Sequence, residues 1–123
     1  MALVQIDFFS QALMRTVTAN VVMPSDKVAI GEDGVPVSVS HPEPFKTLYL
    51  LHGIFGNYTD WVTRSRLQQL AEDREVAVVM PSGDNSFYND HADGSKYGEF
   101  IARELVEVTR RTFNLSPRRE DTF

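Results

Sequence analysis

The chain has 123 residues, of which 42% are hydrophobic, and a formal net charge of −5. This length predicts one small domain with a core of ordinary size, while the negative charge and the scattered Lys and Arg residues argue against nucleic-acid binding. Because the chain contains no cysteine, disulfides, thiolate catalysis and cysteine-based zinc sites are excluded.

The N-terminal segment, MALVQIDFFSQALMR, has no basic leader before its apolar residues and includes Asp7 among them. It is also too short an apolar run to cross a bilayer. We therefore expect a cytoplasmic protein that makes no membrane contact.

The first half of the chain predicts two strands and a surface excursion. Residues 3–9 and 14–23 are rich in Val, Ile, Phe and Thr with partial alternation, which is typical of an antiparallel strand pair. Residues 24–46 contain four of the six prolines and the run GEDG. These features predict an irregular surface segment with a small hairpin turning at Asp33-Gly34.

Two continuous apolar runs follow, TLYLL at 47–51 and VAVVMP at 76–81. Such runs are typical of strands buried on both faces. The segment between them predicts one short amphipathic helix with Leu67, Leu70 and Ala71 on its apolar side and Ser65 as its N-cap. A strand, a helix and a second strand of this kind form a parallel βαβ unit.

A second helix is predicted from apolar residues at three- and four-residue spacing, namely Tyr97, Phe100, Ile101, Leu105 and Val108. Arg110 and Arg111 suit its last turn, and Pro117 follows its end. Glu104 falls on the same face as Ile101, which favours a partly buried ion pair over a site residue.

The run HGIFG at 52–56 directly follows the buried 47–51 strand. Ligands of doubly wound sheets gather at the carboxyl ends of the parallel strands. Two glycines there allow backbone N–H groups to face a bound oxyanion, and such donors stabilise it by about 3 kcal/mol each. The alternative is an ordinary turn in which glycine supplies a positive φ and His52 is merely half-buried.

Three phrases together resemble one family: LYLLHGIFGNYTDW, VAVVMPSGDNSFYND and YGEFIARELVEVTRRTFN. In this order and spacing they are similar to the N-terminal part of the esterase D group of α/β-hydrolases, especially its tributyrin-esterase-like carboxylesterases. That group includes S-formylglutathione hydrolases, and the phrase MPSGDNSFYND is also similar to mycolyltransferases. The resemblance runs from about residue 3 to the last residue.

The resemblance implies a fold and several site residues. The fold would be the N-terminal half of an α/β-hydrolase, with a mostly parallel sheet, an antiparallel N-terminal strand pair and helices on both faces. The backbone N–H of Ile54 matches one of the two oxyanion-hole donors of the family, with Phe55 as a second candidate. Trp61, Phe87 and Tyr88 match positions near the substrate pocket, although aromatic residues of this kind also serve as packing residues.

The serine nucleophile of this fold lies in a G-x-S-x-G motif, and none of the nine serines does. The resemblance places the final REDTF at the entry to the nucleophile strand. We therefore expect residues 1–123 to form a single partial domain that ends just before the nucleophile elbow, with the whole catalytic triad outside this sequence.

Other candidate sites are weaker. The loop NDHADGSKYGEF lacks the Glu that a calcium loop needs at its twelfth position, so no metal and no cofactor are expected. His41 and His91 are read as solvated, and Asp60 as a capping or turn residue.

Two functions remain open from sequence: a serine carboxylesterase acting on a small acyl ester or thioester, and a non-catalytic binding module. The apolar strand at 47–51 would lie between the 76–81 strand and the nucleophile strand, so its second edge would be open here. We therefore expect a complementing C-terminal half or a homo-oligomer as partner.

Overall fold

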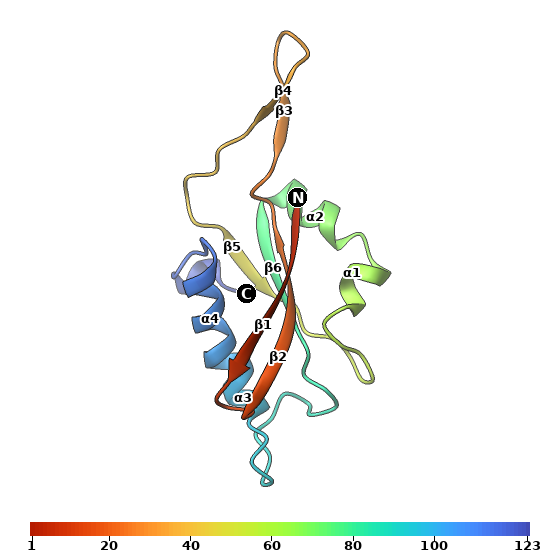
Figure 1. The fold of residues 1–123 in the computed structure, drawn as a ribbon, viewed down its shortest axis with the longest axis vertical. Coiled ribbons are helices and arrows are strands. Elements are labelled where there is room, and N and C mark those ends of the chain that lie inside the picture. The colour runs from red at the N-terminus through yellow and green to blue at the C-terminus, as the bar shows by residue number, and fades with distance from the viewer.

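The computed structural model describes residues 1–123 and contains a mixed four-stranded sheet in the order β1-β2-β6-β5 (Figure 1). The strands are β1 (Ala2–Ser10), β2 (Arg15–Met23), β5 (Lys46–Tyr49) and β6 (Val76–Pro81). β1 and β2 form the predicted antiparallel pair, and β5 and β6 form the predicted parallel pair. β2 joins the two pairs through an antiparallel ladder with β6.

Helices cover both faces of this sheet, as predicted. On one face, α1 (Asp60–Arg64) and α2 (Leu67–Arg74) connect β5 to β6, and Ala71 packs against Val22 and Val78. On the other face lies one long helix, made of α3 (Tyr97–Glu99), the π-helical turn η1 (Phe100–Glu104) and α4 (Leu105–Thr112). The larger core cluster forms there, where Phe100 and Leu105 contact the valines of β2 and β6.

The first connecting helix differs from its prediction because Ser65 interrupts it. The backbone of Ser65 is extended (φ −146°, ψ 172°), which separates α1 from α2. Its hydroxyl accepts a hydrogen bond from the N–H of Leu67 at 3.2 Å, so Ser65 satisfies a free amide of α2 from just outside the helix. Asp60 is the first residue of α1 rather than its cap. Leu70, predicted to face the core, is 47% exposed.

The π-helical turn changes which residues of the long helix are buried. Phe100 and Leu105 are five residues apart and both fully buried, a spacing that a regular α-helix would place on different sides. After this wide turn the buried position is Thr109, whereas the predicted Val108 is only half-buried. The hydroxyl of Thr109 contacts the carbonyl of Leu105 at 2.8 Å, which satisfies it inside the core.

Glu104 does not form the predicted ion pair. Its buried carboxylate accepts hydrogen bonds from the N–H groups of Gln11 and Ala12, at 2.8 and 3.2 Å, and from the hydroxyl of Ser10. Ser10 in turn accepts the N–H of Leu13 at 3.1 Å. Glu104 therefore holds the turn between β1 and β2 against the long helix, and this turn supplies the polar partners that a buried carboxylate needs.

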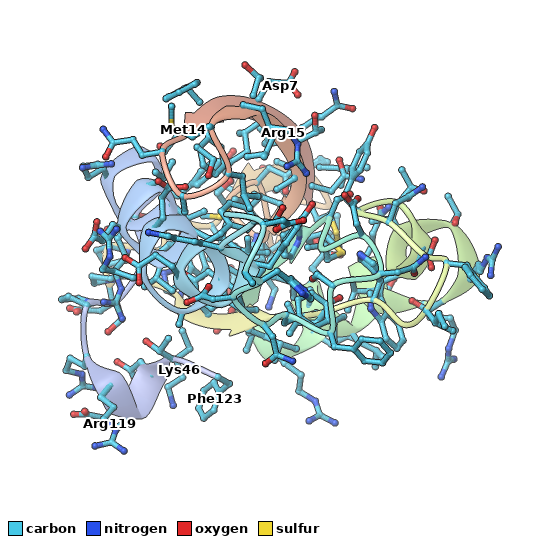
Figure 2. The ribbon with its side chains drawn as sticks, turned by 90° about the horizontal axis from the view of Figure 1, so that it is seen from below. Asp7, Met14, Arg15, Lys46, Arg119 and Phe123 are labelled. Carbon is cyan, nitrogen blue, oxygen red and sulfur yellow. The ribbon has the colours of Figure 1, made fainter.

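The C-terminal residues lie along the edge of β5 that faces away from β6. Thr122 pairs with Thr47 in parallel, and the N–H of Phe123 donates to the carbonyl of Thr47 at 2.9 Å. Figure 2 shows Phe123 beside Lys46 at this edge. The neighbouring bridge from Phe45 to Leu115 fills another part of it. The edge predicted to be open is therefore partly covered by the chain itself, on the side where a further strand was expected.

Residues 24–45 form the predicted excursion and hairpin. The hairpin consists of β3 (Val28–Ile30) and β4 (Pro36–Ser38), and it projects beyond the end of the main sheet (Figure 1). Gly34 has a positive φ of 77° in its turn, a conformation that glycine adopts at little cost. No helix of the structure combines the length and apolar character needed to cross a membrane.

Candidate functional site

Two loops meet at the carboxyl ends of the parallel strands. One follows β5 and contains His52 to Thr59, and the other follows β6 and contains Ser82 to Lys96. The N–H of Tyr58 donates to the hydroxyl of Ser82 at 3.0 Å, which ties the two loops together. This is the end of a parallel sheet at which ligand sites are found.

His52 is a buried link between these loops. Its Nε2 accepts the N–H of Gly83 at 2.8 Å, so Nδ1 carries the proton and donates to the carbonyl of Gly53 at 2.7 Å. Both ring nitrogens are thus occupied by backbone groups. His52 positions the bend that follows it and has no nitrogen left to act as a base.

Tyr88 locks the same segment from the other loop. Its hydroxyl donates to the carbonyl of His52 at 2.6 Å, and burial raises the pKa of this phenol above its ordinary value. The Tyr88 ring lies directly over Gly83, where an added Cβ would come within 2.1 Å of it. Glycine at position 83 is therefore required by this close approach.

The bend itself is a turn from Gly53 to Gly56, closed by the N–H of Gly56 donating to the carbonyl of Gly53 at 3.1 Å. The positive φ of this turn belongs to Phe55, at 62°, and not to either glycine. With a positive φ only at its third residue, the turn is of type II. Gly56 is needed because a Cβ there would lie 2.2 Å from the Asp60 carboxylate, whereas Gly53 has open space around it.

The amides of the bend differ in their partners. The N–H of Phe55 donates to Oδ1 of Asn85 at 2.8 Å. The N–H of Ile54 has no hydrogen-bond partner in the chain. Of the two predicted donors, Ile54 is therefore the one whose N–H is free to bind a ligand.

The predicted aromatic residues lie on two sides of the His52-Gly53 segment. A cavity of about 200 Å³ is lined by Ile54, Asn85, Phe87 and Tyr88 together with His52 and Gly53. A second hollow of about 170 Å³ lies between Gly53 and Trp61. The indole N–H of Trp61 donates to the carbonyl of Leu51 at 3.0 Å, which fixes the ring beside the bend.

Backbone strain is concentrated in this region. Phe55, Asp84, Phe87 and Tyr88 all have positive φ values, between 48° and 62°. Such residues cost free energy and are found most often at functional sites. Phe55 and Phe87 are also 84% and 76% exposed, so packing does not compensate the strain of these two side chains.

Sequence reasoning missed the residues of the second loop that support the bend, namely Ser82, Gly83, Asp84 and Asn85. The available signal was the polar run SGDN directly after the buried 76–81 strand. Asp84 is itself held by the hydroxyl of Tyr97, which donates to it at 2.6 Å.

The other candidates lie away from this site or carry different contacts. His41 stacks on Phe45 with ring centroids 3.9 Å apart, so it is half-buried and not fully solvated. His91 is exposed, and its Nε2 contacts the carbonyl of Ser86 at 2.9 Å. No group of three His, Asp or Glu side chains has the arrangement of a metal site.

The comparisons with known proteins agree with this geometry. The model of the Esterase family matches residues 10–122. An acetyl esterase of Caldicellulosiruptor saccharolyticus is 42% identical over the full chain, which covers 45% of that protein. The chain thus spans less than half the length of the curated relative it matches.

Solved structures give the same result for the fold. The fluorophosphonate-binding serine hydrolase F of Staphylococcus aureus, in a substrate-bound form, is 28% identical with a TM-score of 0.83. The S-formylglutathione hydrolase of the same organism is also 28% identical, with a TM-score of 0.78. In both cases 99% of this chain covers 45% of the other. A ferulic acid esterase at 20% identity, with a TM-score of 0.74, shares the fold.

Proposed function

The chain belongs to the Esterase family, and on this premise we propose that it forms the oxyanion-binding part of a serine carboxylesterase that hydrolyses short-chain acyl esters or thioesters. The observation that carries the proposal is the unpartnered N–H of Ile54, at the carboxyl end of β5 and beside an aromatic-lined cavity. The neighbouring amide of Phe55 is already bound by Asn85.

The chemistry requires this kind of donor. When a serine attacks the ester carbonyl, the carbonyl oxygen gains negative charge, and a fixed N–H stabilises that charge without reorganising. His52, Tyr88 and Gly83 hold the bend through buried hydrogen bonds, so the amide of Ile54 is oriented before the substrate binds. Phe87, Tyr88 and Trp61 supply apolar walls for the acyl or leaving group.

The nucleophile, base and acid are proposed to come from polypeptide outside residues 1–123. The chain contains no G-x-S-x-G motif, and its relatives are more than twice as long. In this proposal, residues 1–123 are one partial α/β-hydrolase domain, and the strand that bears the nucleophile continues along the free edge of β5 next to Thr122.

A fluorophosphonate probe and p-nitrophenyl acetate test the assignment. Residues 1–123 alone should neither be labelled nor turn over the ester above a protein-free blank. Adding the polypeptide that corresponds to the remaining part of the acetyl esterase relative should restore both signals, with the label on the added part. Stoichiometric labelling of residues 1–123 would place the nucleophile within this chain and refute the proposal. Folded, associated parts that stay inactive would favour a non-catalytic binding module.

A further inference from the structure

The β3–β4 hairpin exposes an unusual amount of apolar surface. Five aliphatic side chains on it are between 38% and 70% exposed: Val28, Ile30, Val35, Val37 and Val39. In the register of the hairpin, Ile30 lies opposite Pro36 and Ala29 lies opposite Val37, so the two faces are both apolar. Residues 28–30 and 35–39 include no charged residue.

Nothing in the body of the protein covers this hairpin. Neither hydrophobic cluster includes any of its residues, and Figure 1 shows it projecting beyond the end of the sheet. Only its base is attached, through Lys27, whose ammonium lies 3.0 Å from the Glu75 carboxylate. A two-stranded ribbon is marginally stable without a packing partner, so this one needs a cover.

Charge along the hairpin indicates what the cover is. Its tip carries Glu32 and Asp33, which are exposed and have no ion-pair partner in the chain. At its base lies a polar hollow of about 670 Å³ whose cations include Lys46 and Arg74, which also have no ion-pair partner. Of the acids in this hollow, Glu75 is paired with Lys27 and Asp121 with Arg118, which leaves Glu43.

We propose that two copies of this chain associate through their β3–β4 hairpins about a two-fold axis. The hairpins pack side by side in opposite directions, with aliphatic side chains in contact. In this arrangement the acidic tip of each copy reaches the base of the other, near Lys46 and Arg74. A second copy is the partner that necessarily carries both an acidic tip and a cationic base, which is the condition for an isologous interface.

The exposed area sets the strength of this association. Burying five half-exposed aliphatic side chains removes on the order of 250 Å² of apolar surface per copy. A standard stable interface buries about 800 Å² per partner, so the hairpin side chains supply only part of one. The dimer should therefore be reversible, with a dissociation constant on the order of micromolar.

Sedimentation equilibrium over a range of concentrations tests the proposal. The unaltered chain should show a reversible dimer. The double variant Ile30→Lys/Val37→Lys puts one charge on each face of the hairpin and should raise the dissociation constant at least 100-fold. Met14→Lys is the matched control, since Met14 is 76% exposed in the turn between β1 and β2, far from Lys46 in Figure 2. This control should leave the association unchanged.

Two further variants keep the test specific to the hairpin. Because the chain has no cysteine, Val37→Cys should give a covalent dimer on oxidation and Met14→Cys should not. Glu32→Lys should weaken association by about tenfold and reduce its dependence on salt. A monomer at all concentrations would overturn the proposal. So would a dimer unaffected by the double variant, which would place the contact at the edge of β5, or equal cross-linking from positions 14 and 37.

Discussion

Replacing Ile54 by proline removes one backbone N–H and changes little else. Ile54 is the second residue of the type II turn from Gly53 to Gly56, a position where proline is common because its fixed φ fits. The deleted N–H has no partner in the chain, so its removal breaks no internal hydrogen bond. The side chain is 67% exposed, so little packing is lost. We therefore expect Ile54→Pro to fold normally.

The effect on catalysis should be large. Loss of one oxyanion donor costs about 3–4 kcal/mol of transition-state stabilisation, which is a factor of roughly 10²–10³ in turnover. The amide of Phe55 is unlikely to substitute without first giving up its 2.8 Å bond to Asn85. The loss should appear in kcat more than in KM, because the charge on the carbonyl oxygen develops only in the transition state.

The assay is p-nitrophenyl acetate hydrolysis by an active preparation that contains residues 1–123 together with the nucleophile-bearing polypeptide. Ile54→Ala is the matched control, since it removes the side chain and keeps the N–H, and it should stay within about threefold of the unaltered protein. Circular dichroism and a thermal melt establish that both variants are folded. A folded Ile54→Pro protein with near-normal kcat would refute the assignment and direct the search for the donor to Phe55.

Two further predictions concern stability and are measured by urea unfolding. Phe55→Gly should stabilise the protein by about 0.5–1 kcal/mol, because the relief of a positive φ outweighs the entropy cost of glycine, and Phe55→Ala should show no such gain. Glu104→Ala should destabilise it by about 2–4 kcal/mol, because two N–H groups and the Ser10 hydroxyl lose their buried acceptor. The exposed Glu107→Ala should cost under about 1 kcal/mol, and equal losses at positions 104 and 107 would contradict this account.

The strands and their pairing were predictable because composition and alternation report burial directly. The 47–51 and 76–81 runs could be recognised as buried parallel strands, and Asp33-Gly34 as a turn, from local chemistry alone. The break at Ser65 was not predictable, since a serine between two helical segments suits a cap as well as an interruption. The partners of Glu104 were hidden for a different reason: they come from a turn more than ninety residues earlier in the chain.

The site was predictable in its location but not in its internal wiring. The HGIFG run after a buried strand indicated the bend, yet the sequence suggested glycine as the residue with positive φ, and Phe55 has it. The choice between Ile54 and Phe55 depends on Asn85, thirty residues further along than Phe55. Long-range hydrogen bonds of this kind leave no periodic trace in a sequence.

The wide turn at Phe100–Glu104 has a consequence for comparing this chain with its relatives. A π-helical turn contains one residue more than the α-helical turn it replaces, and it usually arises by insertion of that residue. A relative with a regular helix would therefore align with a one-residue gap somewhere between Phe100 and Leu105. An alignment without that gap would match Leu105 and Thr109 to the wrong face of the relative's helix. The length of this segment, rather than the identity of its residues, is then the feature by which to find the relatives that share the Glu104 contact with the β1–β2 turn.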